Sequence, residues 1–233
     1  MLGTLYGLGV GPGDPELITV KALRKLKESP VIAYPKKQKG SKSYAQKIIE
    51  VYLEPNEKEM MGLVFPMTKD VEILEKMWNE TVESVWEKLN EGKDVAFVTE
   101  GDPLLFSTFI HLMLLMQDLH PEVPIEVVPG ISSINGAASR LGIPLADGDE
   151  RLAIVPARDD YEMIKKVIEE NDCVIFIKVA KVIHLMLEVL RELDLLDKAS
   201  VVTKVTSDEE RIWKADELEG VELEYLTLMV VRK

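Results

Sequence analysis

Short apolar runs alternate with amphipathic segments along nearly the whole chain, and this alternation constrains the fold more than any other feature. We expect strands at residues 4–10, 31–34, 60–67, 94–99, 125–128, 152–155, 173–178, 200–205 and 222–231, with a short one at 211–213. We expect helices at residues 15–28, 43–52, 70–90, 106–119, 133–141, 161–170 and 182–193. Repeated strand–helix order predicts an α/β fold with a largely parallel sheet.

A candidate linker interrupts this order near the middle of the chain. Pro121 and Pro124 bracket a short polar gap, which is typical of a connection between domains. We therefore predict two α/β domains, residues 1–120 and 121–233. The last third is richer in strands, so the second domain is expected to contain an antiparallel part.

The overall charge and composition exclude several classes of protein. The formal net charge is −13, which argues against nucleic acid as a partner because such binding depends on neutralising phosphates. No apolar run reaches the roughly 20 residues needed to cross a bilayer. The N-terminus has no basic region and is interpreted as a strand rather than a signal peptide. Cys173 is the single cysteine, interpreted as a buried strand residue, so a cytoplasmic location is expected.

The basic and imidazole side chains are candidates for ligand binding. Lys36, Lys37, Lys39 and Lys42 fall in one short stretch without an acid. They form either a solvated loop or a positive patch that steers an anionic ligand to an acidic protein. The three histidines show no metal-ligand spacing, so no metal site is predicted; they are His111, His120 and His184.

A glycine-rich segment at residues 7–14, here called the glycine loop, follows the first expected strand. Such a loop lets the backbone approach a ligand closely, although it can also be a tight turn without one. A dinucleotide-binding fingerprint would need Gly at position 12, where Pro12 stands. It would also need an acid at the end of the second strand, and residues 33–37 contain none. The same absence disfavours the common Rossmann-type methyltransferases.

Two further turns follow expected strands, where ligands of parallel sheets bind. In the Asp102 bend, residues 100–103, Asp102 precedes Pro103 and is therefore extended. In the Gly130 bend, residues 128–133, two serines follow a Pro-Gly pair. Each can be a helix-capping turn or a ligand contact. Three such turns, each between a strand and a helix, are more informative together than any one alone.

These motifs resemble those of the tetrapyrrole methyltransferases over essentially the whole chain. The resemblance is carried by residues 9–15, 100–103, 128–130 and 141–145, in this order. Residues 13–22, 34–36, 108–109, 146–152 and 227–233 are most similar to the members that methylate carbon 20 of precorrin-2 or cobalt-factor II, on the way to cobalamin. Phe106 departs from the pattern, because Tyr is more common there, and a hydroxyl contact is in doubt.

The resemblance implies a homodimer whose subunits each hold S-adenosylmethionine (SAM) in a cleft between two α/β domains. The residues it implies for the cofactor are Val10, Gly101, Asp102, Leu105, Ser132, Ser133, Ile177, Lys178, Thr227 and Leu228. Those it implies for the tetrapyrrole are Gly11, Pro12, Gly13, Asp14, Lys36 and Lys37. The general base is not identified, and its candidates are Asp14, Tyr6 and Glu100.

The expected reaction is methylation of an electron-rich carbon by in-line displacement at a sulfonium, which needs no protein-bound metal. Whether the acceptor contains cobalt is left open. The alternatives within the superfamily are a uroporphyrinogen-III methyltransferase, a diphthine synthase and a ribosomal-RNA ribose methyltransferase, the last disfavoured by the acidic charge. A nicotinamide-dependent oxidoreductase and a non-catalytic ligand carrier are the alternatives from other classes.

Overall fold

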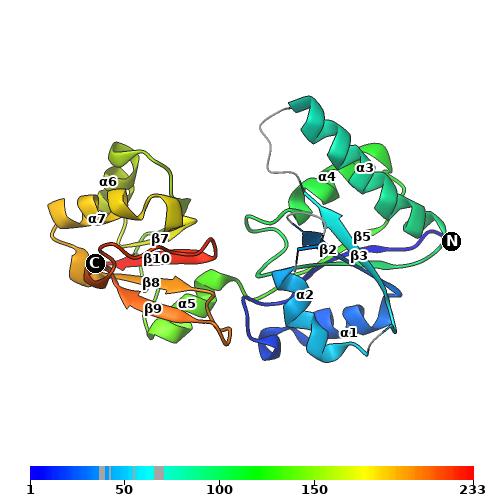
Figure 1. Cartoon of the computed structure of the whole chain (residues 1–233), viewed down its shortest axis with the longest axis horizontal. Helices are drawn as coiled ribbons and strands as arrows, with labels where there is room; N and C mark the ends of the chain where they lie inside the picture. The colour runs from blue at the N-terminus through cyan, green and yellow to red at the C-terminus, as the bar shows by residue number, and fades with distance from the viewer. Residues whose placement is uncertain (37–39, 42, 55, 66–70) are drawn as a thin grey trace. The chain divides into compact units, whose positions relative to one another are not determined.

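The computed structural model describes residues 1–36, 40–41, 43–54, 56–65 and 71–233 (Figure 1). Contacts divide the chain into two compact units, Met1–Ser132 and Ser133–Lys233. The sequence predicts this boundary near residue 121, which is too early. Strand β5 (Ile125–Val128) pairs with strand β1 (Leu5–Gly9), so the residues just after the candidate linker belong to the first unit.

The first unit is built on a fully parallel sheet of five strands in the order β3-β2-β4-β1-β5. Besides β1 and β5, its strands are β2 (Val31–Lys36), β3 (Glu59–Val64) and β4 (Val95–Thr99). Every pairing is parallel, and Leu5 of β1 lies opposite both Val95 and Ile125. All five strands therefore end at one side of the sheet, here called the carboxyl edge, and begin at the opposite amino edge.

Helices cover both faces of this sheet (Figure 1). They are α1 (Val20–Glu28) and α2 (Tyr44–Ile49) on one face, and α3 (Val71–Asn90) and α4 (Phe109–Leu119) on the other. Alternate strand residues point to opposite faces, so Leu8 and Ile32 pack with α1 and α2 while Leu5 and Phe97 pack with α3 and α4. This is why the strands are apolar on both faces, as the sequence pattern indicated.

The second unit holds a mixed sheet of five strands in the order β6-β7-β10-β8-β9. The strands are β6 (Leu152–Pro156), β7 (Cys173–Ile177), β8 (Ala199–Thr203), β9 (Arg211–Lys214) and β10 (Thr227–Arg232). Only β6 and β7 pair in parallel, which confirms the antiparallel part. Helix α5 (Ser133–Leu141) packs on one face, and α6 (Tyr161–Glu170) and α7 (Ile183–Glu192) pack on the other.

Several elements differ from the sequence prediction. The helix expected at 43–52 is α-helical only to Ile49 and continues as a 3-10 turn (Glu50–Tyr52). The segment expected as one helix at 15–28 contains a short 3-10 turn (Pro15–Leu17), an extended Ile18 and only then α1. The Thr19 hydroxyl accepts a hydrogen bond from the Ala22 amide at 3.1 Å, and this cap restarts the helix. Strand β10 begins at Thr227 rather than 222, and α4 begins at Phe109 rather than 106. Part of the strand expected at 60–67 lies outside the described residues.

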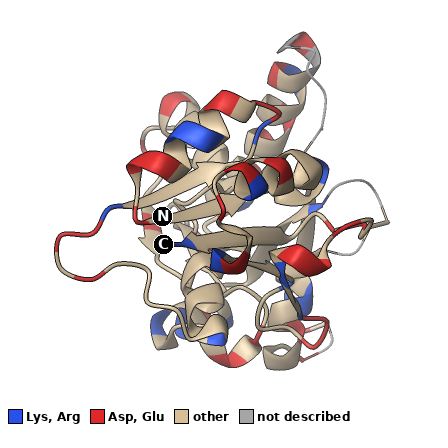
Figure 2. Cartoon of the chain, turned by 90° about the vertical axis from the view of Figure 1, so that its left-hand side faces the viewer, with Lys and Arg blue, Asp and Glu red and all other residues tan. Residues whose placement is uncertain are grey.

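Charged side chains of both signs are interspersed on helices and loops of the second unit (Figure 2). Arg232 pairs with Glu150 at 2.6 Å and Arg140 with Glu210 at 2.7 Å, and Arg232 lowers the pKa of Glu150 by its hydrogen bond. Cys173 is buried in β7, and this burial raises the pKa of its thiol. Within the described ranges, no helix is long and apolar enough to cross a membrane.

Candidate functional site

The carboxyl edge of the first sheet brings the predicted bends together. Strands β4, β1 and β5 are neighbours in the sheet, and the Asp102 bend, the glycine loop and the Gly130 bend follow them in that order. The Gly101 amide donates a hydrogen bond to the Gly11 carbonyl at 2.8 Å, and Val10 donates to the Thr99 carbonyl at 3.1 Å. The first two bends are therefore bonded to each other through their main chains.

Two glycines, Gly9 and Gly130, let these backbones lie in contact. A Cβ atom on Gly9 would lie 2.6 Å from both the Gly101 carbonyl oxygen and the Gly130 Cα. A Cβ atom on Gly130 would clash with the same Gly101 oxygen and with Gly9. Neither position tolerates a side chain without moving main chain, because real Cβ atoms are not found so close to other atoms. The glycines therefore bring three main chains to one point of the carboxyl edge.

Asp102 connects two of the bends through its side chain. One carboxylate oxygen accepts a hydrogen bond from the Leu104 amide at 2.9 Å, and the other accepts one from the Gly130 amide at 3.0 Å. The first bond is local, whereas the second crosses to the Gly130 bend. Both oxygens of this predicted cofactor residue thus bind main-chain amides, although a carboxylate has room for further contacts.

The chain after Asp102 projects apolar side chains into solvent. Leu104, Leu105 and Phe106 are all exposed, and Phe106 has a φ of 55° in the left-handed region, which is rare for an aromatic residue. At the end of this stretch, the hydroxyl groups of Thr99 and Ser107 are 3.0 Å apart. This contact ties the segment that begins at Asp102 back to the end of β4.

Lys36 ends β2 at the same carboxyl edge. Its alkyl chain lies over Gly62 of β3, where any Cβ would collide with it, and its ammonium nitrogen is 5.2 Å from the centre of the Tyr34 ring. Lys36 therefore carries a positive charge near the carboxyl edge, on the strand next to β4. Lys37, Lys39 and Lys42 of the predicted patch lie outside the described residues.

The predicted residues of the second unit also lie at one edge of their sheet. Leu228 pairs with Ile177, and Thr227 pairs with Thr203. Lys178, directly after β7, has a left-handed φ of 60°. The Thr203 and Thr227 hydroxyl groups are both buried and lie 2.7 Å apart. Four cofactor candidates are therefore neighbours within this unit.

Comparisons with known proteins identify the family of this chain. Residues 4–219 match the family model described as Tetrapyrrole (Corrin/Porphyrin) Methylases. The chain belongs to the tetrapyrrole methylases. It is 40% identical to a probable cobalt-precorrin-2 C(20)-methyltransferase of Methanocaldococcus jannaschii, over 98% of this chain and 96% of that protein. It is 33% identical to a cobalt-precorrin-2 C(20)-methyltransferase of Salmonella typhimurium, over 92% and 89%.

The fold of this tetrapyrrole methylase is shared with solved structures. A uroporphyrin-III C-methyltransferase from Thermus thermophilus, solved with S-adenosylhomocysteine, superimposes with a TM-score of 0.70 over 99% of this chain and 98% of that chain. The identity is 22%, so this likeness shows the fold alone. It confirms the prediction of two α/β sheet units and excludes the common Rossmann-type methyltransferase fold.

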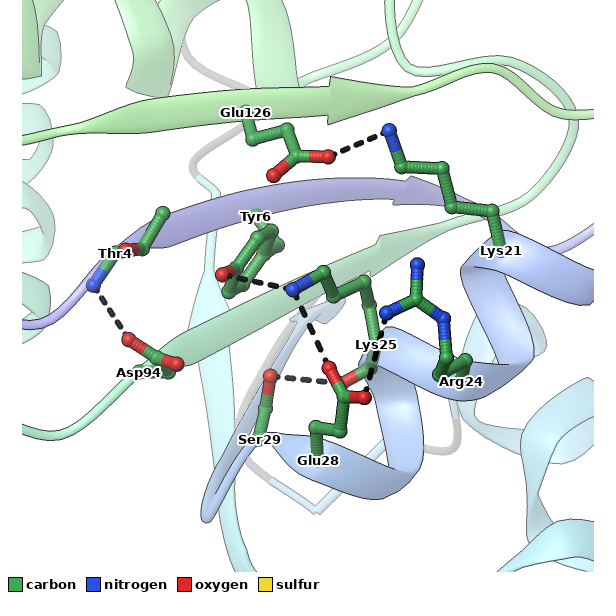
Figure 3. A network of polar contacts seen from close by, with 9 residues as sticks. All are labelled: Thr4, Tyr6, Lys21, Arg24, Lys25, Glu28, Ser29, Asp94 and Glu126. Atoms are coloured by element: carbon green, nitrogen blue, oxygen red, sulfur yellow. Dashed lines mark hydrogen bonds and ion pairs between the residues drawn. The ribbon is translucent and has the colours of Figure 1, made fainter.

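The candidate bases of the methylase lie in different places. Asp14 is in the glycine loop, where its carboxylate accepts a hydrogen bond from the Glu16 amide at 2.8 Å, and Glu100 is in the Asp102 bend. Tyr6 lies within β1, and its hydroxyl accepts a hydrogen bond from the Lys25 ammonium at 3.1 Å (Figure 3). At roughly 3.3 Å per strand residue, Tyr6 is about 13 Å before Val10. The structure thus places two of the three candidates at the bends and Tyr6 away from them.

Some polar residues at these sheet edges are not among the site residues predicted from the sequence. Thr99, Ser107 and Thr203 were missed, and so was the bond from Asp102 to Gly130. A polar residue at the very end of a buried strand was the available sign for Thr99 and Thr203, because such residues lie at ligand-binding edges. Among the described residues there is no group of three or more His, Cys, Asp or Glu that could hold a metal ion.

Proposed function

We propose that this chain is a SAM-dependent methyltransferase that methylates carbon 20 of precorrin-2 or of its cobalt-containing counterpart in cobalamin biosynthesis. The observation that carries this proposal is the 40% identity to the M. jannaschii protein over nearly the full length of both chains. The S. typhimurium relative, which bears the same position in its name, supports the choice of carbon 20 over other positions.

The cofactor site is proposed to be the carboxyl edge of the first sheet, completed by the edge residues of the second unit. The first unit would contribute Val10, Gly101, Asp102, Leu105 and Ser132. The second would contribute Ser133, Ile177, Lys178, Thr227 and Leu228. The contacts of Gly9 and Gly130 support this site, because they bring the main chains of three strand ends together at the edge where parallel sheets bind ligands.

The chain's own residues would act by holding and orienting the reactants. When bound, SAM supplies an electrophilic methyl group on a positively charged sulfur. The rigid bends would hold the acceptor carbon in line with the departing sulfur, which is where most of the acceleration comes from in such a displacement. Exclusion of water would help, since the charge on sulfur disappears in the transition state. Asp14 or Glu100, at the bends, would accept the proton that the methylated carbon loses.

The tetrapyrrole is proposed to lie against Gly11, Pro12, Gly13, Asp14, Lys36 and Lys37. The macrocycle carries carboxylates at its rim, and the positively charged Lys36 lies at the end of β2, near the carboxyl edge. An ion pair there would orient the ring and raise its local concentration at an otherwise acidic protein.

The deciding experiment incubates the purified protein with SAM labelled with carbon-13 in its methyl group. Metal-free precorrin-2 and its cobalt-loaded form are supplied as acceptors side by side. We expect one new labelled methyl signal, assigned by NMR to carbon 20. Label on another carbon, or activity on uroporphyrinogen III alone, would instead make the chain one of the sister enzymes.

Three further properties stay predictions. A homodimer is expected from the family resemblance, and light scattering during gel filtration measures it. A cytoplasmic location and the absence of a nucleic-acid partner are expected from the composition and the charge of −13.

A further inference from the structure

We propose that Phe106 is a substrate-binding residue, whose exposed ring contacts the flat face of the tetrapyrrole at the carboxyl edge. This inference rests on the proposed function and deepens it. Lys36 would bind carboxylates at the rim of the macrocycle, and Phe106 would support its face. In the sequence, Phe106 stands out only because it lacks the hydroxyl group of a tyrosine.

The first argument is that the short segment carrying Phe106 is held at both ends. Pro103, at its start, is buried. At its end, the Ser107 hydroxyl lies 3.0 Å from the Thr99 hydroxyl and accepts a hydrogen bond from the Phe109 amide at 3.1 Å. Residues 104–106, between these two fixed points, are all exposed. Their apolar side chains are therefore presented to solvent by an anchored segment and not by a loose loop.

The second argument is the backbone of Phe106 itself. Its φ of 55° lies in the left-handed region, which costs free energy for any residue that has a Cβ. The ring returns little of this cost within the chain, because 48% of Phe106 is exposed. Glycine would make the same turn without strain. Strained residues of this kind concentrate at ligand sites, so the strain indicates a ligand for the ring.

The third argument is a second exposed apolar side chain at the same edge. Ile131 is exposed in the Gly130 bend. The Gly130 amide donates a hydrogen bond to the Asp102 carboxylate at 3.0 Å, so this bend is bonded to the one that leads into Phe106. Apolar side chains are therefore exposed on two connected bends. Gathered exposure of this kind is typical of a binding surface, whereas single exposed apolar residues are ordinary.

The methyl acceptor is the occupant that these features fit. Leu105, one residue before Phe106, is a proposed cofactor residue, and the acceptor carbon must touch the SAM methyl group for an in-line displacement. A tetrapyrrole presents a flat, apolar face of conjugated rings, and such faces stack on aromatic side chains. Lys36 ends β2, the strand next to β4, so a cation for the rim carboxylates lies near the same edge.

The test titrates cobalt-factor II into protein saturated with S-adenosylhomocysteine, so that absorbance follows binding without turnover. Phe106→Ala should weaken tetrapyrrole binding about tenfold, whereas Phe106→Tyr keeps the ring and should stay within about twofold of wild type. The affinity for S-adenosylhomocysteine, measured by calorimetry, should change less than about twofold in both variants. Leu114→Ala is the matched control. Leu114 is 54% exposed on α4, outside the bends, and its loss should change neither affinity.

A further variant, Phe106→Gly, separates binding from folding. It should lose as much tetrapyrrole affinity as Phe106→Ala, because both remove the ring. It should nevertheless unfold at a higher urea concentration than Phe106→Ala, because glycine adopts a left-handed φ without strain. A glycine variant that is more stable and yet binds the tetrapyrrole poorly would show that the ring serves the substrate and not the fold.

Other outcomes would overturn the proposal. Unchanged tetrapyrrole affinity in Phe106→Ala would reject the contact, and an equal loss for S-adenosylhomocysteine would place the ring in the cofactor site instead. A fall in molecular mass by light scattering would assign Phe106 to a contact between two copies of the chain. Wild-type protein that binds cobalt-factor II but methylates another carbon would refute only the proposed function. Wild-type protein that binds no tetrapyrrole would refute both.

Discussion

The two edges of the first sheet both contain close contacts between main chains, but they differ in the side chains that surround these contacts. At the carboxyl edge, main chains meet directly at Gly9, Gly101 and Gly130. At the amino edge, Gly3 likewise lies against the Lys93 main chain, and ion pairs and hydroxyl groups add further connections. Lys25 binds the Tyr6 hydroxyl at 3.1 Å and Glu28 at 3.3 Å, and Asp94 binds the Thr4 amide (Figure 3).

This difference suggests how one parallel sheet separates stability from ligand binding. An edge closed by ion pairs and hydroxyl groups has already used its polar side chains on itself. At the carboxyl edge, Gly101 and Gly130 are only half-buried, so part of their main chain stays accessible to a ligand. Paired substitutions at the two edges test this separation.

The largest effect is expected from Gly130→Ala. The new methyl group would push the Gly130 bend away from Gly101 and Gly9, and SAM affinity measured by calorimetry should fall more than roughly 100-fold. Gly3→Ala is the matched control, since a Cβ there would clash with the Lys93 carbonyl at the amino edge. It should lower the free energy of unfolding by about 1–3 kcal/mol and leave SAM affinity unchanged in the folded protein. Loss of SAM binding in both variants would contradict the assignment of ligand binding to the carboxyl edge alone.

A smaller effect is expected from Thr99→Val, which keeps the shape of the side chain and removes the hydroxyl that contacts Ser107. The free energy of unfolding should fall by about 1–2 kcal/mol in urea denaturation, and SAM affinity should fall with it as the chain after Asp102 loosens. Ser29→Ala removes a buried hydroxyl that donates to the Lys25 carbonyl at 2.9 Å near the amino edge. It should cost about 1 kcal/mol of stability without changing SAM affinity.

Lys36→Met should act on the tetrapyrrole and not on SAM. Met preserves most of the apolar stem over Gly62 and removes the charge, so the KM for the tetrapyrrole should rise about threefold to tenfold with kcat unchanged. The dependence of KM on salt should also weaken. Lys93→Met removes a cation paired with Glu91 at 2.7 Å at the amino edge and should leave KM as it is. An unchanged KM in Lys36→Met would remove this lysine from the proposed substrate site.

The smallest effect is expected from Tyr6→Phe. The Tyr6 hydrogen bond raises the pKa of Lys25 above its ordinary value, with Glu28 contributing and burial opposing. A raised folded-state pKa means that this stabilisation is complete below the ordinary lysine pKa and is lost as pH rises through the folded-state value. The free energy of unfolding, measured by chemical denaturation, should therefore be about 0.5–1.5 kcal/mol higher for wild type than for the variant at pH 8. The difference should be smaller near pH 11. The kcat should be roughly unchanged, and a large fall would return Tyr6 to the candidate bases.

Sequence-based prediction succeeded where the signal is local. The strand–helix alternation predicted both α/β units, because buried parallel strands must be apolar on both faces. It was wrong where one side chain redirected the chain, as at Thr19, whose cap restarts a helix that looked continuous. It also placed the domain boundary at a proline-rich gap, although β5 after that gap still pairs with β1.

The sequence by itself determined which segments turn at strand ends and which of them lack side chains. Gly9, Asp102 and Gly130 stood out by residue type and position alone. Only the tertiary structure decided that they meet, because that depends on the order β4-β1-β5 in the sheet. The Asp102–Gly130 and Thr203–Thr227 bonds join residues 28 and 24 positions apart, and no local pattern contains such a partner. Strand order is set by how both faces of the whole sheet are covered, so it is a property of the packed unit and not of any segment within it.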